Sequence, residues 1–339
     1  MNERMTLALE GAGAGVLWTA VSFTLLVFTA PFLWIGEALT DLRWHAGLGM
    51  LLISIPGFLL LQRRRLSFGV LVGMALMHCL PGVRVFVPTD HEVLTTGDEL
   101  NFVEVHWGDA PTGGLEELLL TDAADLVVVH GVSPEGRKAL EDGVFEWPHT
   151  YAWPPILTGA PAPLGPSILV YSRYAIADWN AQGFGESAVL ITGNLEGPVL
   201  DVPLTIIDLP TVGPGDRAAA REDLLEELDK RYWPDRTVVL CRLGSSDSSP
   251  AYASLREATG LSDARQGFGR VATSPVTIGG LALPFFRVPR EFVLHGDLVE
   301  VRDCSSQMLR AGERDPVTGS VDSDGPERRM VRTHVRVRA

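Results

Sequence analysis

The chain has 339 residues, of which 46% are hydrophobic and 21% are charged, and its formal net charge is −14. A positive mean hydropathy of +0.16 is unusual for a wholly soluble protein, and the length allows one large domain with additional segments. The acidic balance argues against a nucleic-acid partner, because affinity for phosphate depends on lysine and arginine.

The apolar residues are concentrated in residues 1–88. No charged residue occurs between Glu10 and Glu37, a run of 26 residues, and about 20 apolar residues suffice to cross the core of a bilayer. Trp44 to Gln62 and Leu66 to Val83 are further uncharged runs. We therefore predict an anchor of three transmembrane helices at 1–88. The first run exceeds the roughly 7–15 apolar residues of a cleavable signal peptide, so we expect it to be retained.

The orientation of this anchor follows from Arg63, Arg64 and Arg65, which stand between the second and third predicted spans. Short loops rich in arginine lie on the cytoplasmic side of a membrane. We therefore expect a protein of the bacterial inner membrane, with a cytoplasmic N-terminus and with residues 89–339 in the periplasm. Residues 89–339 carry 22 basic and 38 acidic residues, which is typical of a soluble surface.

Residues 89–339 alternate apolar, β-branched runs with amphipathic segments. The predicted strands lie at 101–107, 125–132, 167–172, 187–195, 203–210, 237–241, 290–303 and 330–338. The predicted helices lie at 114–124, from Ser133 onward, at 217–232 and at 250–259. Many strands with a few interleaved helices predict an α/β or α+β sandwich.

Two further features leave alternatives open. Residues 147–166 are rich in proline and aromatic residues and predict a loop, which serves either as a binding segment or as a stiff connector. Cys241 and Cys304 would share an oxidising compartment in which a disulfide is permitted. Because each lies in a strand-like run, we favour two buried thiols.

Several segments resemble, in order and spacing, the endonuclease/exonuclease/phosphatase superfamily, and specifically its bacterial members with three N-terminal membrane spans. The segments are LNFVEVHW (100–107), DAADLVVVHGV (122–132), GPSILVYSRYAI (165–176), VVLCRLGSSDSSPAY (238–252) and PREFVL (289–294). They are similar to the family forms LRVLTWNV, D-A-D-V-V-V-L-Q-E-V, G-x-x-L-L-S-R-Y-P-I, V-x-V-A-G-D-F-N-x-x-P-x-S-P-A and P-I-D-H-V-L. The resemblance implies a four-layer α/β/β/α sandwich at 89–339.

The family hydrolyses phosphodiesters with Mg²⁺ held by carboxylates and an Asn, assisted by an Asp–His pair. Such hard cations need oxygen ligands. The resemblance aligns His106 with the Asn of the first strand, Gly131 with a metal-binding Glu, and Arg242 and Gly244 with the Asp and Asn after a strand. Asp208 replaces a His, and Glu291 and Phe292 replace the late Asp and His. Asp324 and Gly325 are the best match for the end of the terminal S-D-H motif.

The changes at these positions predict a vestigial site. A guanidinium at Arg242 repels a dication by on the order of several kcal/mol even at an effective dielectric near 20, and Gly131 offers no ligand atom. We therefore expect no catalytic, cofactor-binding or metal-binding residues. An ion pair between Arg242 and a nearby acid is favoured over a new metal site, for which the candidates are Glu104, His106, Asp208, Glu291 and Asp324.

The sequence accordingly predicts a non-catalytic structural or assembly subunit. It would dock on a membrane protein complex, respiratory, photosynthetic or secretory, through its transmembrane helices and extracytoplasmic loops, with 147–166 and 310–327 as candidate docking segments. One alternative is a metal-dependent hydrolase of a phosphodiester or phospholipid headgroup with an altered site. A sensor that binds a ligand without turnover is the third hypothesis.

Overall fold

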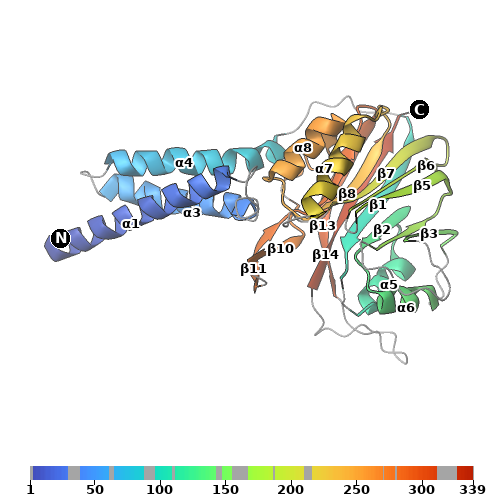
Figure 1. Cartoon of the computed structure of the whole chain (residues 1–339), viewed down its shortest axis with the longest axis horizontal. Helices are drawn as coiled ribbons and strands as arrows, with labels where there is room; N and C mark the ends of the chain where they lie inside the picture. The colour runs from blue at the N-terminus through green and yellow to red at the C-terminus, as the bar shows by residue number, and fades with distance from the viewer. Residues whose placement is uncertain are drawn as a thin grey trace.

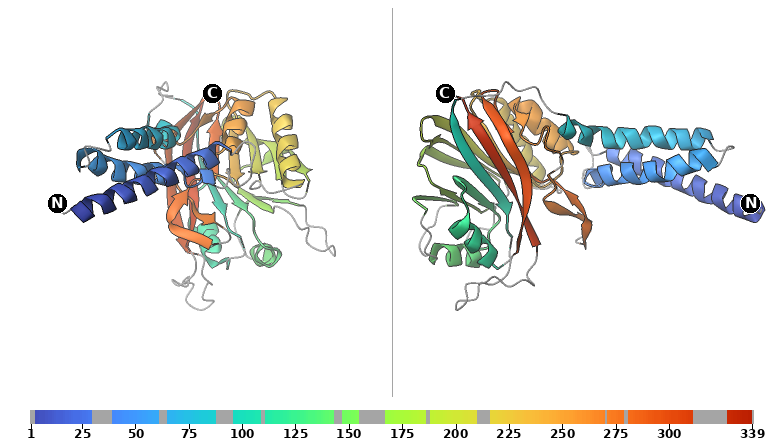
Figure 2. Two further views of the ribbon diagram at one scale, coloured as in Figure 1. Left: turned by 60° about the vertical axis from the view of Figure 1, so that its left-hand side comes forward. Right: turned by 180° about the vertical axis from the view of Figure 1, so that it is seen from behind.

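Three N-terminal helices project as a bundle from one side of a β-sandwich (Figures 1 and 2). The computed structural model describes residues 3–29, 39–60, 65–87, 96–108, 111–142, 147–154, 167–185, 188–209, 216–269, 271–278, 281–310 and 327–338. The amino terminus lies at the free end of the bundle, and the carboxyl terminus lies on the sandwich (Figure 1).

The helices and strands have the following bounds. The helices are α1 (Glu3–Phe28), α3 (Arg43–Leu60), α4 (Arg65–Val83), the 3-10 helix η2 (Arg84–Phe86), α5 (Gly113–Thr121), α6 (Pro134–Asp142), α7 (Asp216–Asp229) and α8 (Pro250–Thr259). The strands are β1 (Asp98–His106), β2 (Leu126–His130), β3 (His149–Trp153), β4 (Ile168–Ser172), β5 (Ile176–Phe184), β6 (Ala188–Glu196), β7 (Asp201–Leu209), β8 (Val238–Leu243), β9 (Ser262–Asp263), β10 (Ser274–Ile278), β11 (Leu281–Val288), β12 (Glu291–His295), β13 (Val299–Arg310) and β14 (Glu327–Val337).

The sandwich consists of two six-stranded sheets. The first sheet has the order β13-β14-β1-β2-β4-β3, and the second has the order β5-β6-β7-β8-β12-β9. β1 runs parallel to β2, and β7 runs parallel to β8. Parallel neighbours need a crossover connection, and α5 and α7 supply it. The carboxyl ends of these two strand pairs are therefore fixed at the same edge of their own sheets.

Helices cover the outer face of each sheet. Leu115 and Leu118 of α5 pack with Val103 and Val105 of β1 in one buried cluster. On the other side, α7 and α8 pack on the outer face of β7, β8 and β12 in a second cluster. The layer order is thus helix, sheet, sheet, helix, and the sandwich expected from the sequence is present.

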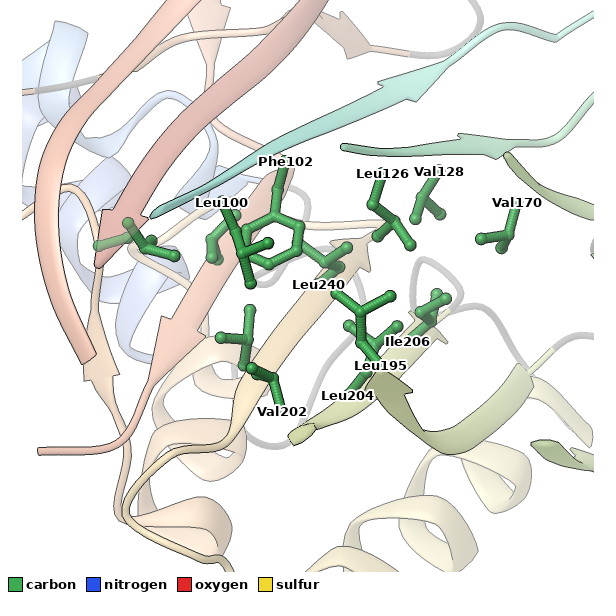
Figure 3. Close-up of a cluster of buried hydrophobic side chains, with 14 of the residues drawn as sticks. Leu100, Phe102, Leu126, Val128, Val170, Leu195, Val202, Leu204, Ile206 and Leu240 are labelled. Carbon is green, nitrogen blue, oxygen red and sulfur yellow. The ribbon is translucent and has the colours of Figure 1, made fainter. Parts of the chain in front are cut away.

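The inner faces of the two sheets form the largest apolar core. Phe102 and Leu126 of the first sheet face Leu204 and Leu240 of the second (Figure 3), and all four are at most 3% exposed. Burying each side chain of this size contributes roughly 1.5–3 kcal/mol. Alternate residues of a strand share a face, so residues two and four positions beyond Phe102 also point between the sheets.

Some strands depart from the sequence-based expectation. β3 lies inside 147–166, which we predicted to be a loop, and β5 was not predicted. β3 is an edge strand that pairs with β4 alone, so Pro154 directly after it costs no ladder hydrogen bond. β5 is also an edge strand and is half exposed, which gave it a weak apolar pattern. Residues 155–166 lie outside the described part of the chain.

The N-terminal helices α1, α3 and α4 overlap the three uncharged runs of the sequence. Among the described helices, α1 is long and apolar enough to cross a membrane, over Gly11–Phe28. The apolar stretch of α4 is shorter, Arg65–Leu80, and α3 carries Arg43 and His45 in its first turn. The expected three helices are therefore present, but one of them rather than three meets the length and hydropathy of a transmembrane span.

The N-terminal part contacts the sandwich through polar groups. The Asp41 carboxylate accepts a hydrogen bond from the Ser246 backbone N–H at 3.0 Å and pairs with the Arg290 guanidinium at 2.9 Å. The Val85 carbonyl accepts the Gly267 N–H at 2.9 Å. These contacts connect the N-terminal part to the loop that follows β8, to the segment after β9 and to the residue before β12. The predicted boundary at 88/89 falls within residues 88–95, which are outside the described part.

The three cysteines are buried and form no disulfide. This agrees with the preference for buried thiols at Cys241 and Cys304. Burial raises the pKa of the Cys304 thiol to about 12 and also raises the pKa of Cys241, where the nearby carboxylates of Glu104 and Asp208 add to the shift. Neither thiol is therefore activated as a nucleophile.

Candidate functional site

Charged and imidazole side chains gather at one end of the apolar core between the sheets. Its members, which we call the polar cluster, are Glu104, His106, His130, Asp208, Arg242 and Glu291. The first three come from β1 and β2 of the first sheet, and the others come from β7, β8 and β12 of the second. Strand alternation explains the placement, because Glu104 and His106 continue the inward row that begins with Leu100 and Phe102.

An ion pair occupies the middle of the polar cluster. Arg242 Nη1 donates to both carboxylate oxygens of Asp208, at 2.8 and 3.1 Å. The two residues face each other because β7 and β8 are parallel with Asp208 opposite Arg242. Burial raises the pKa of Asp208, but the charge of Arg242 together with the hydrogen bond and charge of His130 outweighs that effect and lowers the pKa to about 2. The predicted pairing of Arg242 with an acid is therefore present.

His130 lies between two carboxylates at the base of the cluster. Its Nε2 donates to Glu104 Oε1 at 3.0 Å, and its Nδ1 is 3.5 Å from Asp208 Oδ2. Burial by itself lowers the pKa of His130, but the contacts with Asp208 and Glu104 raise it to about 9. The imidazole is therefore protonated at neutral pH.

Glu104 has one carboxylate oxygen in a hydrogen bond and one without in the described part of the chain. Burial raises the pKa of its carboxyl group to about 7, although His130 acts in the opposite direction. Its Oε2 atom is buried and has no hydrogen-bond partner among the described residues. A buried polar atom without a partner is costly and uncommon in folded proteins.

His106 fills the space beside Gly131. Its Nδ1 donates to the His130 carbonyl at 3.1 Å, and Arg242 Nη2 is 3.5 Å from its Nε2. Burial, followed by the charge of Arg242, lowers the pKa of His106 to about 3, so the ring is neutral. Gly131 has φ +72°, and a Cβ there would lie 2.5 Å from His106 Cε1. A side chain at this position would have to displace the imidazole ring.

Glu291 joins the cluster, but Phe292 does not. Glu291 lies opposite Arg242 in the β12–β8 ladder and accepts a hydrogen bond from Thr273, and burial raises its pKa. Phe292 points to the helix-covered face, where its ring centroid is 4.8 Å from that of Tyr252. Successive strand residues point to opposite faces, so the placement of Phe292 at the site is corrected.

The remaining predicted positions are Gly244, Asp324 and Gly325. Gly244 follows β8, and its N–H donates to the Leu209 carbonyl at 2.8 Å. Asp324 and Gly325 lie outside the described residues. His130 was missed, because the family pattern directed attention to the next residue, Gly131. The signal for it was present, since His130 continues the inward row of Leu126 and Val128.

The polar cluster does not fit a divalent metal ion. Among the described residues, no group of three or more His, Cys, Asp or Glu side chains is arranged to hold a metal. The guanidinium of Arg242 and the protonated ring of His130 already neutralise the carboxylate of Asp208. Hard cations require several oxygen donors, and here the central oxygens are bound to nitrogen donors. The arrangement is that of an internal ion network.

No family model matches the sequence, and no curated protein matches it. Among solved structures, an endonuclease/exonuclease/phosphatase family protein from Bacteroides thetaiotaomicron is similar with a TM-score of 0.50 and 8% identity, over 72% of this chain and 100% of that chain. An endonuclease/exonuclease/phosphatase from Bacteroides vulgatus has a TM-score of 0.49 and 12% identity, over 71% and 100%. The chain therefore has the endonuclease/exonuclease/phosphatase fold. At this identity the likeness concerns the fold alone.

Proposed function

We propose that this protein is a non-catalytic, membrane-anchored subunit whose sandwich domain serves for docking or assembly rather than for hydrolysis. The observation that carries the proposal is the bidentate contact of Arg242 with Asp208, at 2.8 and 3.1 Å, where the family resemblance implies a metal. A charge that would repel the ion is thus fixed in position by a buried acid.

The contact between His106 and Gly131 supports the same proposal independently. The family resemblance assigns a metal-binding Glu to position 131, but a Cβ there would meet His106 Cε1 at 2.5 Å. The positive φ of Gly131 also disfavours any residue with a side chain. Two of the positions that would bind a metal are therefore occupied by groups that exclude it.

The anchor supports a membrane location. Trp18 of α1, Leu52 of α3 and Leu66 of α4 are 71%, 75% and 86% exposed. Covering each such side chain with lipid or protein would contribute roughly 1.5–3 kcal/mol, which favours α3 and α4 as second and third spans beside α1. The amino terminus, the carboxyl end of α3 and the amino end of α4 lie at the end of the bundle away from the sandwich (Figure 1). This arrangement agrees with a cytoplasmic N-terminus and periplasmic residues 89–339 in a bacterial inner membrane.

The proposed partner is an integral membrane complex, of the respiratory or photosynthetic kind. The exposed apolar faces of α1, α3 and α4 offer contacts within the membrane, and the segments at 147–166 and 310–327 are the candidate extracytoplasmic contacts. A domain that has lost catalysis is retained when its surface or its anchor still has a role. For this protein the remaining role is binding to a partner.

Purification from the native membrane in a mild detergent tests the proposal. We expect the full chain to elute together with a larger integral complex, and we expect Leu52→Lys and Leu66→Lys, which place charges on the exposed faces, to weaken that association. Lys230→Gln on the sandwich is the matched control. Recovery of the wild-type chain as a lone monomer would count against a subunit role.

A hydrolase with an altered site is the second candidate. It is favoured by the buried Glu104, whose pKa is raised to about 7 and whose Oε2 has no hydrogen-bond partner among the described residues, since perturbed acids gather at functional sites. This candidate requires cleavage of a phosphodiester that depends on Mg²⁺ or Mn²⁺ and is abolished by Glu291→Ala. We expect the purified full chain to show neither activity nor bound metal.

A further inference from the structure

A cavity of about 460 Å³ lies where the anchor meets the sandwich. We call it the junction cavity. The anchor contributes Arg43, Leu80 and Val85, and the sandwich contributes Tyr252, Arg256 and Arg265 together with the loop at Asp247–Ser249. A smaller cavity of about 310 Å³ shares Arg43 and the serines of that loop and extends to the end of α1. The two hollows thus form adjoining parts of one region.

The junction cavity lies at the level where a membrane surface would be. The smaller hollow reaches Val27 and Phe28, the last residues of the apolar stretch of α1. Leu80 ends the apolar stretch of α4, and Arg43 begins α3. The sandwich lies directly beyond these helix ends (Figure 2). A ligand in the cavity would therefore contact the apolar helices on one side and the polar domain on the other.

The cavity carries positive charge that the protein itself does not neutralise. Arg265 is balanced by Asp263 and Asp247, at 2.6 and 3.2 Å. Among the described residues, Arg43 and Arg256 have no carboxylate partner. Arg43 donates to the Met77 carbonyl at 3.1 Å and Arg256 contacts the Tyr252 hydroxyl at 3.5 Å. The Nε atoms of Arg43 and Arg256 are both buried and lack a hydrogen-bond partner among the described residues.

Arginine donors of this kind select for phosphate. A guanidinium binds phosphate oxygens through two parallel N–H groups, which gives a stronger contact than a single neutral hydrogen bond. The amino end of α8 also lines the cavity through Ser249, which caps that helix, and its partial positive charge adds to the same preference. The chemistry of the cavity is therefore that of a phosphate ester.

The apolar rim decides in favour of a lipid. Phe28 and Leu80 are 52% and 64% exposed beside these charged groups, so a ligand with both a phosphate and hydrocarbon chains would satisfy the whole surface. We propose that the junction cavity binds the phosphate headgroup of one phospholipid between Arg43 and Arg256, with its acyl chains along α1 and α4. This inference rests on the proposed membrane anchor.

Native mass spectrometry of the full chain released from lipid nanodiscs tests the inference. We expect one phosphatidylglycerol molecule to remain bound per wild-type chain. We expect the double variant Arg43→Gln/Arg256→Gln to bind it about tenfold more weakly, because two charge-assisted contacts are lost. Lys230→Gln removes one positive charge from a side chain that is 62% exposed, directly after α7 and outside the lining of either cavity, and should bind like the wild type. Equal retention by the double variant and the wild type would overturn the inference.

Two further ligands separate a lipid from a free phosphate ester. Diacylglycerol, which lacks phosphate, should not be retained, whereas retention equal to that of phosphatidylglycerol would refute the role of the arginines. Soluble glycerol phosphate should compete only weakly, whereas competition as effective as that of the lipid would show a free phosphate site instead. Alkaline extraction of the membranes distinguishes the proposed membrane anchor from the proposed lipid site. Release of the chain would refute the anchor. A chain that stays in the membrane but retains no lipid would refute the lipid site alone.

Discussion

Two arginines lie on opposite faces of the second sheet, Arg265 at 1% exposure and Arg242 at 25%. They differ in how fully the groups around them are hydrogen-bonded. Arg265 lies under α8, where its guanidinium donates to Asp263, Asp247 and the Tyr252 hydroxyl and lies 4.6 Å from the ring centroid of Phe292. Arg242 lies between the sheets and pairs with Asp208, an acid that it shares with His130.

The two arginines differ in how completely the polar atoms around them are hydrogen-bonded. All three side-chain nitrogens of Arg265 have acceptors, which is the usual state of a buried charge with a structural role. The polar cluster instead leaves Glu104 Oε2 without a partner among the described residues. Local departures from full hydrogen bonding are expected at functional or strained sites. Burial of charge alone therefore does not identify a functional site, whereas incomplete hydrogen bonding within it is informative.

Removing the satisfied arginine should have the largest effect on stability. Arg265→Met leaves Asp263 and Asp247 buried without a cation, and breaking a buried pair in this way costs about 3–5 kcal/mol. The melting temperature of the full chain in detergent measures the loss. Arg231→Met serves as the control, because its pair with Glu227 is partly exposed and is worth about 0–1 kcal/mol. A loss for Arg265→Met no larger than that of the control would contradict the comparison.

A side chain at Gly131 should have the next largest effect. Gly131→Ala combines a left-handed backbone, which costs roughly 1–2 kcal/mol, with a Cβ placed 2.5 Å from His106 Cε1. Crowding of this kind adds about 1–3 kcal/mol. In the background of His106→Ala, the added methyl group should cost only the backbone part. Thermal unfolding of the four chains gives the coupling energy, and a coupling of zero would mean that His106 does not fill this space.

Removing Arg242 should cost less than removing Arg265. In Arg242→Met, Asp208 keeps His130 as a neighbouring cation at 3.5 Å, so only part of its compensation is lost, and we expect about 1–3 kcal/mol. The same melting experiment measures it against Arg265→Met. If the two variants lost equal stability, His130 would not be supporting Asp208, and the view of the cluster as a shared network would be wrong.

The sequence predicted the frame of the sandwich well because apolar alternation is a local signal. The segments that contain Phe102, Leu126 and Leu240 have the apolar, β-branched pattern of buried strands. The prediction from sequence was incomplete where a strand forms only by pairing with a distant segment. The edge strand β3 depends on pairing with β4. The inward position of His130 and the outward position of Phe292 were missed for another reason: they follow from strand phase, which is a local signal, but the family pattern was used in its place.

The same reasoning applies to the anchor and to the site. Uncharged runs predicted the three helices, but whether each spans a bilayer depends on lipid contact, which the residues alone do not encode. At the site, the sequence predicted an acidic partner for Arg242, and the structure shows Asp208 in that place. The residues did not predict that His106 would occupy the space beside Gly131. That contact depends on the register in which β1 pairs with β2, and the register is not visible in either segment alone.

The pH dependence of stability should be the smallest effect and the most specific to the polar cluster. His130 has a pKa of about 9 in the folded chain against an ordinary value of 6.5. Its contribution is therefore fully present below pH 6.5 and is lost as the pH rises through about 9. Asp208 acts in the opposite direction, because its pKa is lowered from 3.8 to about 2, so its contribution is present above pH 3.8 and is lost only as the pH falls through about 2.

Glu104 also lowers the stability of the folded chain as the pH rises, but at a lower pH than His130 does. Its pKa is raised from 4.5 to about 7, so the folded state becomes less stable as the pH passes between those two values. We therefore expect the stability of the full chain to fall by about 1 kcal/mol between pH 6.5 and 9, since coupled sites spread the change. His130→Gln should flatten this decline, whereas His334→Gln on the outer face of β14 should keep it. If stability fell with pH as steeply in His130→Gln as in the wild type, the two acids would not be holding the imidazole protonated. Arg242 would then be the only cation beside Asp208, and the polar cluster would not be a network that shares one acid between two cations.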